Sequence, residues 1–467
     1  MTTYSAVVTT GIYCRPGCGA KPLAENVLIF ELPAAAEAAG FRACHRCRPY
    51  RVAGPVAASA PELVCQVVQL IIDGALDDGR TEAGLADRVG MSARHLRRLF
   101  LAHLGATPDQ LARSRRSHFA RRLLDDTDLP VIDVAFASGF GSLRQFNRAM
   151  QEVFRASPTD LRGRRHRADR LVADGGLALR LPVLPGYDWD AVRAFLAARC
   201  VPGVEAVDGD TYRRTIVVGS TPGLLEISPG GADYLMLRAH LPCWEGLIHV
   251  VGRAGRLLGI DIDHTAGAAA LAADPVLGAI VRERPGLAVP GAWSPFELGV
   301  WAILSRERDP GSVAQLLESL VTSLGTPVPG LPGDLTHVFP DAETVTSASL
   351  AAIGFPVADA TAAESLAVAL AKAGGAVGPG TSLDALAALP GVEQNVRDYI
   401  AFRLGLREAF PVGDASLAAA LADLGLTSPG TAAGPVPWAE RWRSWQALAA
   451  VHLMAHGDSL ARQAKPV

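Results

Sequence analysis

The chain has 467 residues, of which 49% are hydrophobic and 19% are charged, and its net charge at pH 7 is −3. This composition predicts globular cores and excludes a disordered chain. The sequence has no apolar run long enough to span a bilayer, and its first residues lack the pattern of a secretory signal. We therefore expect a cytoplasmic protein with no membrane partner and with about three or four domains.

The charge is distributed unevenly. Residues 1–170 contain 24 Lys and Arg against 17 Asp and Glu, whereas the remainder contains 20 against 30. The first part therefore carries a surplus of positive charge, which favours a polyanion such as nucleic acid as its partner.

The first segment, residues 1–52, is short and contains two pairs of cysteines. A Cys-x3-Cys pair (Cys14, Cys18) is followed after 25 residues by a Cys-x2-Cys pair (Cys44, Cys47). In a reducing compartment this spacing predicts a tetrathiolate site for one Zn²⁺ rather than disulfides. Spacing alone favours a structural clip, because so small a domain cannot fold on core burial alone. We expect the other three cysteines to be ordinary packing residues: Cys65, Cys200 and Cys243.

A linker, "RVAGPVAASAP" (51–61), precedes a helical segment at 62–166. The spacing of Leu85, Val89, Leu96 and Leu99 and the N-cap residue Ser92 predict a helix-turn-helix, and "VIDVAFASGFGSLRQFNRAM" repeats the plan. The first turns of a recognition helix reach base edges. The candidates for DNA contact are Arg94, His95, Arg97 and Arg98 in the first unit and Ser142, Arg144, Gln145 and Arg148 in the second. The alternative for any one of them is a phosphate contact or a solvated position.

A polar connector (166–176) leads to the second half of the chain. Residues 177–285 alternate as an α+β domain, and residues 286–460 are rich in Ala and Leu and read as all-α. The expected fold class is therefore multidomain and mainly α. It comprises a small zinc α/β domain (1–52), a tandem helix-turn-helix (62–166), an α+β domain (177–285) and an all-α domain (286–460).

The sequence around the cysteines is more specific than their spacing. The stretches "TTGIYCRPGC", "ENV" and "AAGFRACHRCRP" closely resemble the N-terminal domain of the Ada family of alkylation-response proteins. The resemblance implies that Cys14 is a zinc ligand that irreversibly takes a methyl group from a DNA methylphosphotriester. Four thiolates on Zn²⁺ carry a net charge of about −2, so each sulfur stays nucleophilic. Methylation removes one negative charge, which raises the affinity for DNA and turns repair into a transcriptional signal.

Two further features belong to this resemblance. Arginines flank the cysteines and either hold phosphates or form a solvated surface: Arg15, Arg46, Arg48 and Arg51. Only ten residues precede Gly11, whereas the family usually carries a further stretch there. Translation therefore starts further upstream, or the domain lacks an edge element.

Residues 62–165 resemble the AraC-type DNA-binding domain that follows the zinc domain in this family, which implies promoter DNA and RNA polymerase as partners.

The C-terminal half departs from the Ada scheme, because it lacks a second methyl-accepting Pro-Cys-His-Arg run. Instead, "YDWDAVRAFLAARCVPGVEAV" resembles the N-terminal domain of AlkA-type 3-methyladenine DNA glycosylases. Four later stretches resemble the helix-hairpin-helix catalytic domain of these enzymes: "WSPFELGVWAIL", "LAALPGVEQNVRDYIAFRLG", "AFPVGD" and "WAERWRSWQALAAVHL". Such an enzyme flips an alkylated purine out of DNA and stabilises an oxocarbenium-like sugar with one carboxylate.

Asp414 occupies the catalytic aspartate position that this resemblance implies, although by itself the residue reads as an N-cap. The absence of a lysine at or near Asn395 predicts a monofunctional glycosylase, and the absence of late cysteines predicts no iron–sulfur cluster.

The hairpin departs from the family pattern. It reads Leu389-Pro390-Gly391-Val392-Glu393, so Gly391 remains to approach a DNA phosphate while Glu393 places a carboxylate beside it. Gln394 and Asn395 replace a pair that often includes a pocket tryptophan, and Arg306-Glu307-Arg308-Asp309 replaces a Gln-Gln-Val-Ser-like run. Four aromatic residues are candidates to replace this tryptophan, and the alternative for each is a place in the core: Tyr187, Trp189, Trp293 and Tyr399.

These departures leave two alternatives. The chain either excises alkylated purines with a shifted preference, or it is a DNA-binding transcriptional regulator whose glycosylase-like domain is inactive or altered.

Overall fold

The computed structural model describes residues 3–15, 17–19, 22–51, 60–77, 79–166, 169–171, 176–306, 308–346, 350–372, 391–426 and 439–464. Residue contacts divide the chain into two compact units. Unit 1 comprises Met1–Leu184, Gly230–Gly255 and Ile260–Asp263, and unit 2 comprises Pro185–Pro229, Arg256–Gly259 and His264–Val467. Most of the linker at 51–61 and the first two residues of the hairpin lie outside the described residues.

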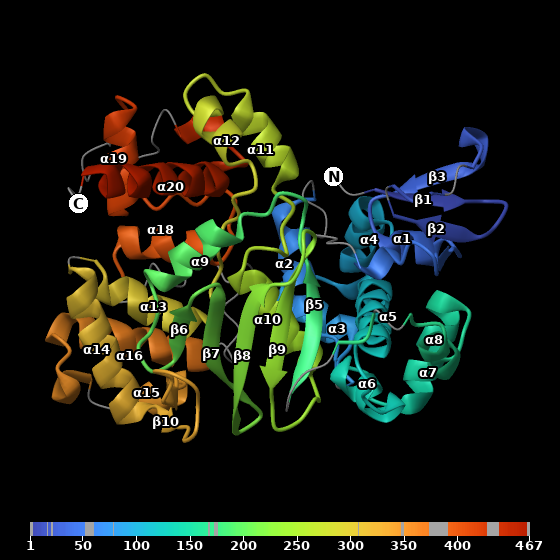
Figure 1. The fold of residues 1–467 in the computed structure, drawn as a ribbon, viewed down its shortest axis with the longest axis horizontal. Coiled ribbons are helices and arrows are strands. Elements are labelled where there is room, and N and C mark those ends of the chain that lie inside the picture. The colour runs from blue at the N-terminus through green and yellow to red at the C-terminus, as the bar shows by residue number, and fades with distance from the viewer. Residues whose placement is uncertain are drawn as a thin grey trace. The chain divides into compact units, whose positions relative to one another are not determined.

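Unit 1 begins with a small sheet of order β3-β1-β2-β4 (Figure 1). Its strands are β1 (Tyr4–Val7), β2 (Ile12–Cys14), β3 (Val27–Phe30) and β4 (Arg42–Ala43), with helix α1 (Pro33–Ala38) between the last two. β1 pairs antiparallel with β2 and β3, so Tyr4–Val7, which precede Gly11, form an inner strand. β2 and β4 are parallel, and their pairing brings the two pairs of cysteines to the same end of the sheet.

The next helices of unit 1 form two helix-turn-helix units, as predicted. They are α2 (Glu62–Ile72), α3 (Glu82–Arg88), α4 (Ala93–Leu104), α5 (Pro108–Asp126), α6 (Val131–Ala137), α7 (Leu143–Phe154) and α8 (Pro158–Gly163). The hydroxyls of Ser92 and Ser142 cap α4 and α7, as N-cap residues do. Gly90 and Gly139 lie in the two turns with positive φ, where only glycine avoids strain. Leu85, Leu96 and Phe146 are buried in the cores.

The rest of unit 1 comes from the α+β segment. Strand β5 (Leu177–Pro182) pairs antiparallel with β9 (Tyr234–His240), and most of helix α10 (Leu247–Leu257) also belongs to this unit.

Cys65 and Cys200 are partly buried, but Cys243 is exposed in the loop before α10. The prediction that Cys243 is a packing residue was therefore wrong, because the loop carries it to the surface.

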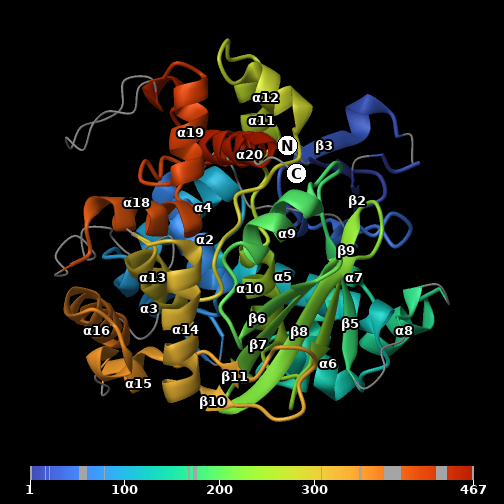
Figure 2. The same cartoon turned by 60° about the vertical axis from the view of Figure 1, so that its left-hand side comes forward.

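Unit 2 contains helix α9 (Trp189–Ala197) and an antiparallel meander of β6 (Glu205–Asp208), β7 (Thr211–Val218) and β8 (Thr221–Pro229) (Figure 2). A helical region follows, with α11 (Thr265–Ala272), α12 (Gly278–Glu283), α13 (Pro295–Leu304), α14 (Pro310–Leu324), α15 (Ala342–Thr346), α16 (Val357–Lys372), α18 (Gln394–Arg403), α19 (Ala415–Asp423) and α20 (Gln446–Ala464). This region also holds a short strand pair, β10 (Thr326–Pro327) with β11 (His337–Val338). No helix among the described residues is both long and apolar enough to cross a membrane.

Two close approaches position the helices of unit 2. A Cβ on Gly299 of α13 would lie 2.1 Å from Leu366 of α16, and a Cβ on Gly457 of α20 would lie 1.9 Å from the carbonyl oxygen of Ser416. A larger residue at Gly457 would clash with backbone, whereas one at Gly299 would force the side chain of Leu366 to move. The second contact holds α20 against the first turn of α19, immediately after Asp414.

His452 of α20 is a buried polar group in the core of unit 2. It is 0% exposed, and within the described part of the chain neither ring nitrogen has a hydrogen-bond partner. Burial, followed by repulsion from His264 and Arg284, lowers the pKa of His452 from its ordinary value to about 4. The native protein therefore keeps this ring neutral where the unfolded chain would protonate it.

We expect the free energy of unfolding to fall by about 3 kcal/mol as the pH drops from 6.5 to 4, because the unfolded state binds this proton first. His452→Leu should remove that loss and, at neutral pH, raise stability by about 1–2 kcal/mol by eliminating the unsatisfied nitrogens. Denaturant midpoints at pH 4, 6.5 and 7.5 measure both effects. His456→Leu is the control, since His456 lies one turn further along α20 and pairs with Asp423 at 2.9 Å. An identical pH response in all three proteins would contradict the role of His452.

Candidate functional sites

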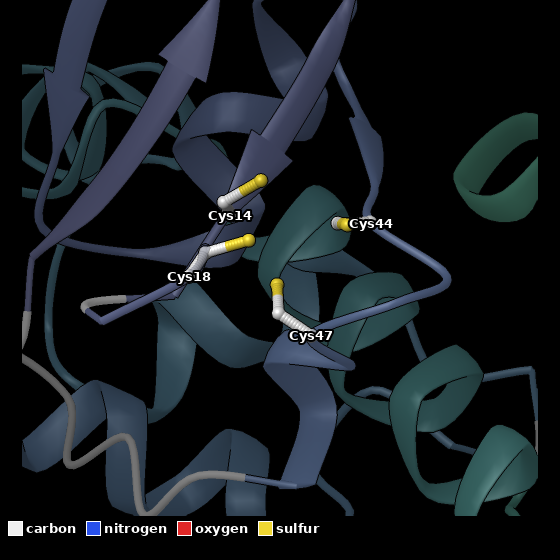
Figure 3. Close-up of side chains that lie close together, drawn as sticks. All are labelled: Cys14, Cys18, Cys44 and Cys47. Carbon is white, nitrogen blue, oxygen red and sulfur yellow. The ribbon is translucent and has the colours of Figure 1, made fainter. Parts of the chain in front are cut away.

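The four paired cysteines converge at the end of the small sheet (Figure 3). Cys14 ends β2, Cys44 follows β4, and the backbone N–H of Cys44 donates to the carbonyl of Tyr13 at 3.0 Å. Together with Cys18 and Cys47 they bring four sulfur atoms within 4.8 Å of one another. Sulfurs bound tetrahedrally to Zn²⁺ at 2.3 Å lie about 3.8 Å apart, so the cluster fits that ion.

The four thiols also need a bound cation if they are to ionise together. Burial, followed by Cys44 and Cys47, raises the pKa of the Cys14 thiol well above its ordinary value, and burial raises the pKa of Cys47 to about 12. Four thiolates therefore coexist only around a positive charge. Cys14 is the most buried of the four at 6% exposed, whereas the other three are partly exposed.

The flanking arginines have different positions. Arg15 and Arg46 are exposed, and Arg46 lies 3.8 Å from the sulfur of Cys18. Arg48 is buried and pairs with Asp169 at 2.6 Å and with Asp125 at 3.7 Å. Arg48 is therefore neither a solvated group nor a phosphate contact, because the two carboxylates hold it in the interior. The side chain of Arg51 lies outside what the structure describes.

Helix α5, which joins the two helix-turn-helix units, contacts the cysteine domain through hydrogen bonds. The hydroxyl of Tyr13 donates to Glu37 at 2.7 Å, and Nε2 of His118 in α5 lies 2.6 Å from Glu37 and 3.1 Å from Tyr13. Tyr50, after the last cysteine, donates to Asp125 of α5 at 2.8 Å. The residue beside Cys14 is thus one hydrogen bond away from the helix that links the two DNA-reading units.

The DNA contacts predicted for the two helix-turn-helix units lie at or near the first turns of α4 and α7, but several of these side chains already have partners within the protein. Arg97 binds Glu82 at 2.6 Å, Arg98 lies 3.0 Å from His95, and Arg148 binds Glu152 at 2.8 Å. The hydroxyl of Ser142 accepts the N–H of Gln145 as the cap of α7. Arg94 and Arg144 are exposed, and among the described residues neither has a recorded ion pair.

Unit 2 contains a cavity of about 1120 Å³ that is open to solvent and lined by α9, α13, α14, α18, α19 and α20. Asp414 lies in its wall and caps α19, with Oδ1 accepting the N–H groups of Ser416 at 3.0 Å and Leu417 at 3.1 Å. Its outer oxygen, Oδ2, lies 3.5 Å from Arg199. Asp414 therefore combines the N-cap position with a carboxylate oxygen turned toward the cavity.

An aromatic pair faces the same cavity. The rings of Trp301 and Tyr399 stack with centroids 5.1 Å apart and an interplanar angle of 25°. Tyr399 was a candidate from the sequence, whereas Trp301 was missed because it lies inside an apolar helix. Of the other candidates, Trp293 packs against Arg214, and Tyr187 and Trp189 line a different pocket.

The unusual residues at the hairpin compensate one another. Glu393, which precedes α18, pairs with Arg306 at 2.6 Å, and Arg306 and Arg308 both donate to the buried Asp359 of α16. Gly391 has φ +76° and lies against Ala362, so it keeps the tight turn. Glu393 at the hairpin and the two arginines after α13 thus belong to one ion-pair cluster. In the sequence they are far apart, so they looked like two unrelated departures from the family pattern.

Comparison with known proteins matches three family models to the chain. Residues 2–50 match the metal-binding domain of Ada, residues 85–164 match a helix-turn-helix domain, and residues 178–294 match the AlkA N-terminal domain. These models define the class as a zinc-bearing DNA-binding regulator joined to a glycosylase-like half.

A probable bifunctional transcriptional activator/DNA repair enzyme AlkA of Mycobacterium tuberculosis is 37% identical over 96% of this chain and 91% of its own length. The chain therefore belongs to the family of bifunctional AlkA-type transcriptional activators and DNA repair enzymes. DNA-3-methyladenine glycosylase 2 of Escherichia coli is 28% identical over 58% of this chain and 94% of its own length. The 3-methyladenine DNA-glycosylase of Archaeoglobus fulgidus shares the fold, with a TM-score of 0.52 and 17% identity over 60% of this chain and 99% of that chain.

These findings confirm the predicted Ada–AlkA fusion and its multidomain, mainly α fold. They also confirm one tetrathiolate zinc site on Cys14, Cys18, Cys44 and Cys47, because the Ada metal-binding model covers all four and the structure brings their sulfurs together. The helix-turn-helix domain makes DNA the partner. The boundaries of the four domains remain a prediction.

Proposed function

We propose that the chain senses alkylation of the DNA backbone, activates transcription of repair genes and excises alkylated purines of the 3-methyladenine type. One observation carries this proposal: a single chain holds both a cluster of four thiols against a DNA-reading unit and a cavity with a carboxylate beside an aromatic pair. The activities named for its relatives support the same reading.

In the sensor reaction, the sulfur of Cys14 attacks the methyl carbon of a methylphosphotriester. A C–S bond forms while the C–O bond breaks, and the oxygen keeps the electron pair, so the phosphate regains its negative charge. Zinc, when bound, holds the four sulfurs as thiolates. The product is a thioether with no acidic proton, so the transfer happens once per chain.

The signal then depends on how the cysteine domain contacts the rest of unit 1. The loss of one negative charge weakens the repulsion of DNA phosphates. The hydrogen bonds among Tyr13, Glu37 and His118, in which the Glu37 carboxylate accepts, offer a direct route from the residue beside Cys14 to α5. We place the action in the cytoplasm, on promoter DNA, with RNA polymerase as the recruited partner.

In the excision reaction, an alkylated base enters the cavity and stacks on Trp301 and Tyr399. The bond between C1′ and the base nitrogen breaks with its electron pair on the base, and water adds to C1′ and gives up one proton to solvent. Oδ2 of Asp414 stabilises the positive sugar and orients the water, while its Oδ1 stays fixed by α19. The sequence has no lysine at Asn395 or in the rest of α18 to form a Schiff base, which supports a monofunctional hydrolysis.

The test uses the full wild-type chain and DNA treated with a methylating agent. We expect one added CH₂, about 14 Da, on the peptide that contains Cys14, and release of 3-methyladenine into solution. Methyl on Cys44 or Cys47 contradicts the sensor assignment. The alternative function, a regulator with an inactive C-terminal half, is favoured by the pairing of Asp414 with Arg199, and methyl uptake without base release would establish it.

A further inference from the structure

Arg199 is a charged residue inside the cavity that the excision chemistry does not require. It follows α9, and its guanidinium lies 3.8 Å from the centre of the Phe195 ring and 5.7 Å from that of Trp301. Its Nε donates to the hydroxyl of Tyr399 at 3.0 Å, and one terminal nitrogen lies 3.5 Å from Oδ2 of Asp414. The guanidinium therefore contacts both the aromatic wall and the carboxylate.

The guanidinium keeps its charge in this position. Burial alone would lower the pKa of Arg199, but Tyr399 and Asp414 raise it above its ordinary value. Arg403 also donates to the hydroxyl of Tyr399, at 3.0 Å. The carboxylate and the aromatic wall thus face a permanent positive charge at short range, where the surrounding protein screens it less than water would.

Damaged bases fall into two classes of charge. A purine alkylated at N3 or N7 is a cation in DNA and leaves as a neutral molecule. A neutral damaged base takes the electron pair of the broken bond and develops negative charge as it leaves. A nearby cation therefore opposes binding of the first class and stabilises the departure of the second.

We propose that Arg199 is a selectivity residue, which lowers the preference of the cavity for cationic alkylpurines relative to neutral damaged bases. It does so by offsetting the charge of Asp414 and by placing a positive charge where the base departs. The proposal rests on the glycosylase function proposed above. It concerns the ratio between two substrate classes, not the presence of activity.

The first experiment compares single-turnover excision of 7-methylguanine, a cation, with that of hypoxanthine, which is neutral, from duplex DNA. In Arg199→Met the ratio of cationic to neutral excision should rise about tenfold over wild type, because the positive charge is gone while an unbranched side chain remains in its place. Arg199→Lys keeps a cation and should return the ratio toward the wild-type value. The two rates in each ratio are measured on one preparation. A smaller fraction of folded protein lowers both rates equally and leaves their ratio unchanged.

A second measurement needs no catalysis. Binding is compared for two duplexes, one with a pyrrolidine in place of the sugar, which is a cation, and one with a tetrahydrofuran, which is neutral. Arg199→Met should raise the preference for pyrrolidine about tenfold. Arg193→Met is the matched control, since Arg193 lies on α9, binds the carbonyl of Gly209 at 3.0 Å and does not line the cavity.

The outcomes separate the two claims. Release of both bases with an unchanged or lowered ratio in Arg199→Met overturns the role of Arg199 and leaves the glycosylase intact. Release of neither base by wild type, together with no preference for pyrrolidine in any variant, overturns the glycosylase and the selectivity role together. A ratio that rises equally in Arg193→Met also overturns the role of Arg199, because the effect would then not depend on the cavity.

Discussion

Cys14→Ser protein gains no methyl group from methylphosphotriester DNA, whereas wild type gains one. The reason is that the sulfur of Cys14 is the proposed acceptor, and a serine hydroxyl at neutral pH is a far weaker nucleophile than a zinc-held thiolate. Intact-mass spectrometry measures the gain, and zinc content is determined on the same sample. Cys65→Ser is the matched control, because Cys65 lies in α2, away from the metal cluster, and should methylate like wild type.

Methylation of a cysteine other than Cys14 would also have a physical reason. Cys14 is 6% exposed, while Cys18, Cys44 and Cys47 are partly exposed and so more accessible to a DNA backbone. A wild-type peptide map with the methyl group on one of those three would reassign the acceptor. Loss of zinc in Cys14→Ser does not obscure the result, since the wild-type map identifies the acceptor independently.

Asp414→Asn lowers the rate of base release by about 10²–10³-fold under single-turnover conditions, because it removes the negative charge that stabilises the sugar. Asparagine caps helices as well as aspartate does, so Oδ1 should still accept the N–H groups of Ser416 and Leu417. Any fall in the thermal transition of the variant should therefore come from the lost pairing with Arg199 and not from loss of the cap. Release of 3-methyladenine from alkylated DNA is the measurement.

The matched control for this variant is Asp309→Asn. Asp309 caps α14, with Oδ1 accepting the N–H of Ser312 at 3.0 Å, and it does not line the cavity. It undergoes the same chemical change at the same helical position and should keep full activity. Equal release by Asp414→Asn and wild type would remove Asp414 from the reaction and leave it as a cap only.

Local signals in the sequence predicted a large part of this structure. The caps Ser92 and Ser142 and the glycines of the two turns act within a few residues, so the two helix-turn-helix units could be placed from sequence. The four thiols were predictable for a different reason, because their spacing is a property of the metal they bind. Asp414 was predicted as a cap, which the structure confirms, and its catalytic role stays a prediction from the resemblance.

What escaped prediction depends on residues that are distant in sequence. Arg48 lies beside a cysteine ligand, yet Asp169 and Asp125 hold it in the interior. Arg97 lies on a recognition helix but is bound by Glu82. Trp301 and Arg199 lie 98 or more residues from Tyr399 in the chain, so no local pattern indicates that they share a cavity with it. Burial of Cys14 is likewise a property of the folded domain.

The pairing of Arg306 with Glu393 has a consequence for how the sequence can change. Glu393 alone would present a bare carboxylate to a DNA phosphate, and Arg306 alone would leave the charge of that cluster unbalanced. Each residue is tolerable because the other is present. Positions 306 and 393 are therefore energetically coupled: replacing both residues should cost less stability than the sum of the two single replacements.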